Sequence, residues 1–379
     1  MKPRRVVTVL LPAVSGLSRD LVRGIAEYAE TQGDWHLVLE LYGMVGPNSF
    51  RAIQQGDGVL TESLLPLSNP ASPQWEIPVV GMQDLRLLKH GPVVSSDNPA
   101  TGRMAGEYFA EKGMTHLAYV SYAKGNQTEK GLREAAAAAG LSCQSYYLGD
   151  EKPELDVRAR KRLMHWFEAL PVPTGVLFRD DQLARKFMDF LPTEWLPERM
   201  GLLGIGNDPL VCGLARPGLS SIERDGRAIG RKAAELLHRI MDGEDLPASA
   251  HLIPPTHVVE RDSTGIEYTP DPLVTRAVRR MEERLQDPEP IEALCRAIGA
   301  SRRTLERRFE QALGRSVWRE RRHLQIRRAR HCLRNTDKSL AWIFDHCGFS
   351  SPPQFSRVFH QEVGVTPRKY RMGNEMRAR

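Results

Sequence analysis

Short apolar runs alternate with longer amphipathic stretches over the first 270 residues of this 379-residue chain. Runs of strand length that are separated by helical stretches of about 10–15 residues indicate βαβ units and buried parallel sheets. With so many repeats, two doubly wound α/β lobes are favoured over a single sheet. The clearest strands are predicted at Val6–Pro12, Trp35–Leu41, Gly58–Leu60, Ile77–Met82, His116–Tyr122, Gly175–Arg179 and Gly201–Ile205, and the clearest helices at Arg19–Gln32, Ala100–Lys112, Glu129–Ala139, Val157–Leu170 and Arg227–Met241.

A second pattern, with helical periodicity throughout, occurs twice near the C-terminus, at Ile291–Leu313 and Leu340–Val363. Each copy is a short apolar-periodic segment, a glycine turn, a serine N-cap candidate and a second amphipathic segment (Gly299 and Ser301; Gly348 and Ser351). A helix, a tight turn and a second helix at this spacing is how many proteins place one helix in the major groove of DNA. One copy is weak evidence, because helical hairpins are common. Two copies joined by the arginine-rich segment Val317–Arg334 predict an all-α DNA-binding domain.

Charge divides the chain in the same region. From Asp271 onward there are 24 Lys and Arg residues against 13 Asp and Glu, whereas the preceding residues have 29 against 34, within a net charge of +6. A basic block attached to an acidic body suggests a module that binds a polyanion. The alternative, a solvated basic helix surface, is disfavoured by the repeated helix pairs. The apolar and charged fractions, 41% and 26%, are those of an ordinary globular protein, and the length suits two or three domains.

Several function classes are disfavoured by the sequence. The five cysteines show no C-x-x-C and no paired spacing, which predicts a reducing compartment without disulfides or a metal site. No signal-peptide core and no apolar run of about 18 residues is present, so we expect a cytoplasmic protein. Gly204-Ile205-Gly206 lacks the third glycine of a dinucleotide fingerprint, and no P-loop, H-E-x-x-H or G-x-S-x-G motif occurs. We therefore expect neither an enzyme nor a cofactor.

Polar side chains follow many of the predicted strands. In doubly wound folds, ligands bind beyond the carboxyl ends of the strands, so these loops form a candidate site. Carboxylates and amides suit a hydroxyl-rich ligand, because each can contact two hydroxyls, and Arg adds a planar fork of donors. The alternative is that each residue only caps the following helix, which is an equally good interpretation of any single one. The candidate ligand-binding residues are Ser15, Ser18, Arg19, Gln83, Asp84, Asp97, Thr128, Asp181, Asn207 and Asp208.

Three segments resemble the sugar-binding body of LacI/GalR-type repressors, which has the periplasmic-binding-protein fold: Ser95–Ser121, Asp180–Ala184 and Gly218–Leu237. The first follows that family's D-x4-G…A-x2-YF-x3-G-x2-H run. Further along, Asp271–Arg371 is similar to the AraC family throughout and ends in GF-x5-F-x-R-x-F…G-V-T-P-x2-Y-R. The combination resembles the xylose-responsive regulators.

The resemblance implies a ligand-binding domain at 1–264, a linker at 265–272 and an AraC-type domain at 273–379. Within the last, helix-turn-helix units are expected at 291–313 and 340–363, with a linker helix at 317–334. It also implies the partners: double-stranded DNA at a promoter or operator, a small-molecule effector, a second copy of the chain in a homodimer and, for an activator, RNA polymerase.

Carried over residue by residue, the resemblance places Arg19, Asp97, Asp181 and Asn207 at ligand-facing positions. The sequence departs from the family at two others. Relatives usually have Asp where this chain has Gly206, so Asn207 and Asp208 would supply the hydroxyl contacts, and a sugar-binding Arg lies where this chain has Thr128. The effector is therefore expected to be a pentose, another sugar or a small polyol. The alternative is a constitutive DNA-binding protein whose sensor domain has lost its ligand.

In the first helix-turn-helix unit, Leu305 and Phe309 mark the buried face, which leaves Arg303, Thr304 and Arg307 facing the groove. Arg can fork onto guanine and Gln onto adenine, whereas other Arg side chains contact phosphates. The candidate DNA-binding residues are Ser301, Arg302, Arg303, Thr304, Arg307, Ser351, Gln354 and Arg357.

The second unit departs from the pattern. Pro352 and Pro353 suit a first helical turn but replace polar base-reading residues, and Phe344 occupies the crossing position that Cys295 fills in the first unit. We therefore expect the first unit to read sequence and the second to add affinity. Between them, Trp318, Leu324, Ile326 and Leu333 of the linker helix are predicted to pack inward, with Arg319, Arg322, Arg327 and Arg330 as phosphate partners.

Overall fold

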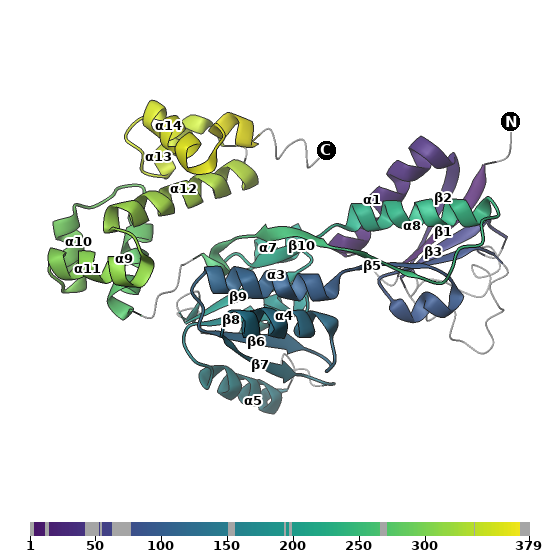
Figure 1. Ribbon diagram of the computed structural model, residues 1–379, viewed down its shortest axis with the longest axis horizontal. Coiled ribbons are helices and arrows are strands. Elements are labelled where there is room, and N and C mark those ends of the chain that lie inside the picture. Colours follow the sequence, from purple (N-terminus) through teal and green to yellow (C-terminus); the bar gives the residue numbers. More distant parts are fainter. Residues whose placement is uncertain are drawn as a thin grey trace.

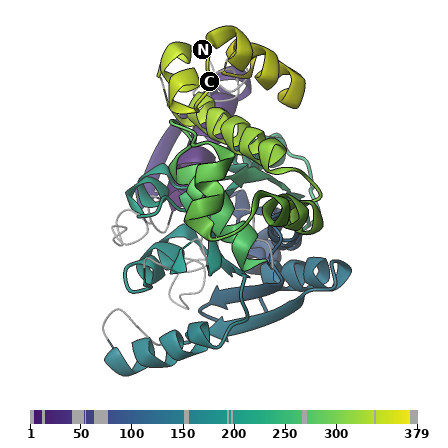
Figure 2. The same cartoon turned by 90° about the vertical axis from the view of Figure 1, so that its left-hand side faces the viewer.

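Figure 1 shows the computed structural model as three bodies in a row: two α/β lobes and a helical domain, which lies next to the second lobe. Turned by 90°, the green and yellow helices of this domain lie in front of the lobes (Figure 2). The structure describes residues 4–11, 15–41, 53, 55–62, 77–150, 156–192, 195–196, 199–265, 271–336 and 338–371. Two doubly wound lobes followed by an all-α domain is the predicted fold class, which is confirmed.

The first lobe contains a six-stranded sheet in the order β11-β5-β4-β3-β1-β2, with every pair parallel. Helices α1 (Gly16–Tyr28) and α8 (Gly226–Met241) pack on it, and alternate residues of β1 point toward them: Val7, Val9 and Leu11 share one core with Leu21 and Ile229. The strands are β1 (Arg5–Leu11), β2 (Trp35–Leu41), β3 (Gly58–Thr61), β4 (Val79–Met82), β5 (Val93–Ser96) and β11 (Ala250–Ile253), and a 3₁₀ helix covers Leu85–His90.

The second lobe has the order β12-β10-β9-β8-β6-β7, parallel except where β12 runs antiparallel to β10. Because side chains alternate along a strand, Leu117 and Tyr119 pack in one core and Ala118 and Val120 in the other. The elements are β6 (His116–Ser121), β7 (Ser142–Tyr147), β8 (Thr174–Phe178), β9 (Met200–Ile205), β10 (Ser220–Arg224), β12 (Pro255–Val259), α3 (Asn98–Glu111), α4 (Gln127–Ala138), α5 (Val157–Glu168), α6 (Asp181–Met188) and α7 (Pro209–Leu214).

The chain passes between the lobes three times. Strand β5 leads into α3 at 96–98, β10 into α8 at 224–226, and β11 into β12 at 253–255. Two of these crossovers touch, since the Nη2 atom of Arg224 lies 3.4 Å from Oδ1 of Asn98. The carboxyl ends of both parallel sheets therefore meet at one cleft beside the crossovers.

One helix pair in each lobe packs backbone against backbone through reciprocal glycines. In the second lobe, a Cβ atom at Gly102 would lie 1.9 Å from the Thr128 carbonyl oxygen, and one at Gly131 would lie 2.0 Å from that of Pro99. Gly24 and Gly230 make the matching approach between α1 and α8. Any larger residue would force these helices apart, so the glycines fix how α3, which begins at the cleft, sits on its lobe.

The helical domain contains two cores that share one long helix. In α12 (Val317–Asn335), Val317 and Leu324 pack in the first core, whereas Ile326, Ala329 and Leu333 pack in the second. The other helices are α9 (Pro272–Glu283), α10 (Ile291–Ile298), α11 (Arg302–Leu313), α13 (Leu340–His346) and α14 (Pro352–Val363).

Trp318 corrects the predicted inward face of α12. Its side chain is 61% exposed and lies under the Arg322 guanidinium, 4.1 Å from the ring centroid. Val317 and Leu324 define the inward face of the helix. Trp318 directly follows Val317 and is therefore turned by about 100° away from that face. Among the described residues, no helix has both the length and the apolar character needed to cross a membrane.

Candidate ligand cleft and DNA interface

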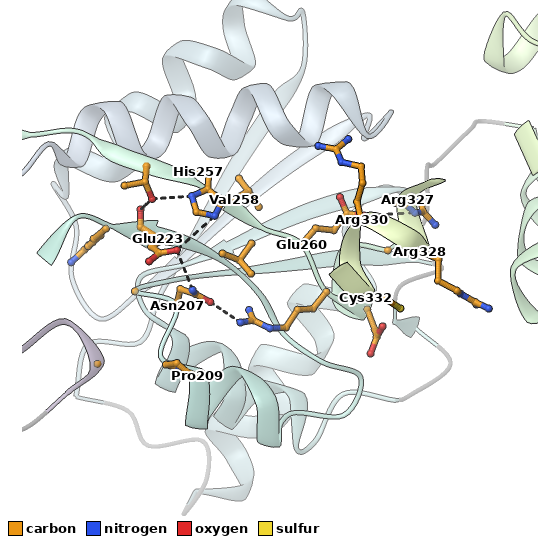
Figure 3. Close-up of a pocket in the computed structure, with 18 of the residues that line it drawn as sticks. Asn207, Pro209, Glu223, His257, Val258, Glu260, Arg327, Arg328, Arg330 and Cys332 are labelled. Carbon is orange, nitrogen blue, oxygen red and sulfur yellow. Dashed lines mark hydrogen bonds and ion pairs between the residues drawn. The ribbon is translucent and has the colours of Figure 1, made fainter. Parts of the chain in front are cut away.

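A crevice of about 1870 Å³ opens between the lobes and extends outward to the helical domain. Its inner end is lined by Gly16 and Arg19 from the start of α1, by Asn207 after β9, and by Glu223 and Arg224 at the end of β10. Its outer end reaches α9 and α12 (Figure 3). The inner end lies between strand ends, which is where doubly wound folds bind ligands.

The start of α1 brings three of the predicted residues together. Ser15 caps the helix by accepting from the Ser18 amide at 3.1 Å, and their hydroxyls lie 2.9 Å apart. Arg19 reaches across the cleft, where its Nη2 atom donates to Oδ2 of Asp208 at 3.2 Å. This bond joins the lobes directly, so a ligand that enters here must compete with it or bind beside it.

Glu62 belongs to the same cluster although it was not among the sequence candidates. It directly follows β3, and its Oε2 accepts from the Ser18 hydroxyl at 3.2 Å. Burial raises the pKa of Glu62 to about 7, against the smaller lowering effects of the Ser18 hydrogen bond and the Arg224 charge. Its position after a predicted strand was the signal that could have found it.

On the second lobe, the predicted acceptors already have partners. Asp181 is 3% exposed and accepts from the Ser221 hydroxyl at 2.5 Å and from the Asp208 amide at 2.8 Å. Burial is the main cause that raises the pKa of Asp181. Oδ1 of Asn207, a residue in the left-handed region at φ 50°, accepts from Arg261 at 2.7 Å, and Figure 3 shows this bond beside Glu223.

The remaining candidates lie at four different places. Gln83 accepts from the amide and hydroxyl of Ser96 at 3.3 and 3.2 Å, and its Nε2 is buried without a partner among the described residues. Asp97 caps α3 by accepting from the Ala100 amide. Asp84 is held by a bidentate pair with Arg86, and Thr128 is buried where α4 meets α3. The structure thus gathers Ser15, Ser18, Arg19, Asn207 and Asp208 at the cleft, with Asp181 behind them, but not Asp84 or Thr128.

Arg224 is a second cleft residue that sequence reasoning missed. Its Nε is buried and has no hydrogen-bond partner in the described part of the chain, and its Nη2 makes only the long contact with Asn98. Burial lowers the pKa of this guanidinium. The polar strand that ends at Arg224 was itself not predicted, so the residue did not stand out as a strand end.

In the first helix-turn-helix unit, α11 presents a basic outer face. Arg303 and Arg307 are exposed and form no ion pair with any described residue. Arg302 instead pairs with Glu306 at 3.0 Å and Glu292 at 3.3 Å. Two candidates act on the first turn itself, since the Ser301 hydroxyl accepts from the Thr304 amide. The two unpaired arginines are therefore the better placed to contact DNA.

In the second unit, Ser351 caps α14 and Arg357 is exposed. The Gln354 side chain is half-buried, and its Oε1 accepts from the amide and hydroxyl of Ser350 at 3.0 and 2.7 Å. Phe344 is partly buried at the margin of the second core. A Gln that holds its own N-terminal turn is less available to adenine, and weaker sequence reading by this unit stays a prediction.

The linker helix meets the sensor through a partly buried ion network. Lys112, which follows α3, lies 2.8 Å from Oε1 of Glu260, which follows β12, and Nε of Arg327 lies 3.8 Å from the same oxygen. Arg327 also pairs with Glu282 of α9. Figure 3 places Glu260 and Arg327 at the outer end of the crevice. Arg327, predicted as a phosphate partner, is therefore part of the junction between the domains.

Residues 107–264 match the family described as the periplasmic binding protein-like domain, and residues 294–373 match the helix-turn-helix domain. The chain is 29% identical to the xylose operon regulatory protein of Escherichia coli K12 over 97% of both chains, and 26% identical to that of Haemophilus influenzae over 97% of this chain and 98% of the other. A solved structure described as the xylose-binding transcription activator xylR covers 98% of this chain and 99% of its own, at 27% identity and a TM-score of 0.71. The chain is an AraC-type transcription regulator with a periplasmic-binding-protein-like sensor domain.

In the ranges that the structure describes, no group of three or more His, Cys, Asp or Glu side chains is placed to hold a metal ion. The cysteines of the regulator are unpaired thiols.

The raised pKa of Glu62 predicts that the free energy of unfolding depends on pH. Between about pH 4.5, where the unfolded carboxyl ionises, and about pH 7, the folded protein binds more protons at this site, so the contribution of Glu62 to stability falls as pH rises. In Glu62→Gln this loss is absent, and the variant should gain up to about 3 kcal/mol relative to wild type between pH 5 and pH 8. Urea unfolding at both pH values measures it. The exposed Glu107→Gln is the control, and parallel pH profiles for wild type and Glu62→Gln would contradict the assignment.

Mutations in the two helix-turn-helix units should have different effects on DNA binding: in the first unit they should change base preference, and in the second they should change affinity. Arg303→Ala should relax base preference at one or two positions, because each good Arg–guanine pair contributes about 1–3 kcal/mol of discrimination. Gln354→Ala should lower affinity with preference unchanged. Selection of bound sequences from a random duplex pool measures both, with exposed Arg158→Ala in the sensor as control. The account is wrong if Arg303→Ala keeps base preference and Gln354→Ala abolishes it.

Proposed function

We propose that the regulator binds a small polyhydroxylated ligand between its lobes and that the bound ligand changes its affinity for DNA. The observation that carries this proposal is the cleft itself, where polar side chains of both lobes meet and are joined by the Arg19–Asp208 bond. The names of the relatives point to xylose as one candidate. Gly206 and Thr128, which replace polar residues of the family pattern, make other sugars and polyols candidates as well.

The ligand would act by changing the distance or angle between the lobes. Arg19 and Asp208 lie on opposite lobes, and a ligand bound beside them would favour one closure state over another. Helix α3 begins at the cleft with its cap Asp97 and is followed by Lys112, which pairs with Glu260 next to Arg327 of the DNA-binding domain. A change at one end of this rigid helix reaches the other without an intermediate loop.

The finer features of the proposal come from the resemblance. They are a homodimer that binds paired half-sites, activation through RNA polymerase, and a place in the cytoplasm, where the DNA is. No enzymatic step or cofactor is part of the proposed function.

Thermal unfolding of the full chain against pentoses, hexoses, polyols and sugar acids tests the sensor. A ligand at about 100 times its Kd should stabilise the native state by about 2.7 kcal/mol. Arg19→Ala should lose most of this shift, whereas Arg103→Ala, at an exposed arginine that pairs with Glu134 outside the crevice, should keep it. If no member of the panel shifts the transition, the constitutive alternative replaces the proposal.

A further inference from the structure

The cleft has fewer available acceptors than its sequence suggests. Both carboxylate oxygens of Asp181 are occupied by protein donors, as is the amide oxygen of Asn207. Asp208 is engaged by Arg19 through Oδ2 and by the Leu210 and Val211 amides through Oδ1. Gly206 contributes no side chain at all. Of the carboxylates and amides at the carboxyl end of β9, each one described is thus already satisfied by the protein.

The guanidinium of Arg224, in contrast to these acceptors, lacks a hydrogen-bond partner for its Nε among the described residues. This Nε is buried, and no carboxylate of a described residue lies within ion-pair distance of the guanidinium. A buried donor without a partner costs about 1–3 kcal/mol, and more when it is charged. Arg224 lines the crevice beside Glu223 and Asn207, so a ligand can reach it.

Because Arg224 lacks an acceptor, the cleft favours a ligand that is rich in acceptor atoms. A neutral sugar brings hydroxyls, each of which needs an acceptor for its proton. The carboxylates of Asp181 and Asp208 are occupied, and Glu223, which also lines the crevice, is contacted by Asn207 at 3.5 Å and by His257 at 3.7 Å. A carboxylate brings two acceptor oxygens and no proton, and a guanidinium binds it in a planar, bidentate pair. On this basis, and resting on the proposed function, we propose that the effector is a sugar acid whose carboxylate binds Arg224.

Glu62 does not oppose this arrangement. Its pKa of about 7 means that a large fraction is uncharged near neutrality, and a protonated carboxyl can donate to the ligand. The Ser18 hydroxyl, which Glu62 holds at 3.2 Å, places another hydroxyl-binding group on the first lobe. The ligand's hydroxyls would therefore face Ser18 and Glu62, while its acid group faces the crossover at Arg224.

Isothermal titration of the full chain with matched pairs tests this inference: D-xylose and D-xylonate, D-glucose and D-glucuronate, D-galactose and D-galacturonate. At least one acid should bind 10-fold or more tightly than its neutral partner. Arg224→Gln should lower the affinity for that acid by about 10- to 100-fold and leave any weak binding of the neutral sugar unchanged. Arg103→Gln, which removes a 43%-exposed arginine that pairs with Glu134 and does not line the crevice, is the matched control.

Two measurements keep the outcome clear. Thermal unfolding of Arg224→Gln without ligand shows whether this variant folds. Arg224→Lys keeps the charge but not the planar fork of donors, so its affinity for the acid should lie between those of wild type and Arg224→Gln. Equal or tighter binding of the neutral sugars overturns the inference and leaves the proposed function standing. An acid affinity that Arg224→Gln does not alter overturns it as well. If none of the six compounds binds, the inference fails, and the wider ligand panel alone decides the proposed function.

Discussion

Movement of one sensor lobe against the other takes place at the three crossovers that join them. Two of them continue as rigid elements toward the same point: α3 starts at the first and β12 at the third, and the residues that follow them, Lys112 and Glu260, pair at 2.8 Å. Arg327 of the linker helix meets that pair. The second lobe therefore meets the linker helix at this ionic junction, and the reciprocal glycines that hold α3 against α4 keep α3 fixed on that lobe.

The DNA-binding domain is arranged to pass this movement on. Arg327 lies in the middle of α12, whose two ends pack in the cores of the two helix-turn-helix units. It is also paired with Glu282 of α9, the helix that connects the sensor to the first unit. A displacement of α12 or α9 would thus alter how α11 and α14 are presented to a duplex, and the energetic coupling required is of the order of 1–3 kcal/mol.

The sequence predicted the central strands and the helix pairs well, because these are apolar or strongly periodic. Strand β2 was predicted at its observed bounds, Trp35–Leu41. Strands β5, β7, β10, β11 and β12 were not among those predicted. Each contains polar residues, as in VVSS of β5 and SCQSYY of β7, so none forms a continuous apolar run. Arg224 was missed with its strand. The ends of the strands could be predicted from the sequence. Whether Asp84 faces a ligand or pairs with Arg86 depends on side-chain contacts, which the spacing of residues along the chain does not determine.

The central claim is that a ligand in the cleft changes DNA affinity through the junction at Glu260. The most direct measurement is the DNA affinity of the full chain at fixed salt, with and without a ligand already shown to bind, in wild type and Glu260→Gln. The account predicts a change of about 5- to 150-fold in wild type and a much smaller one in Glu260→Gln, which should still bind both DNA and ligand. An affinity that saturating ligand leaves unchanged in wild type would contradict the account and favour constitutive DNA binding.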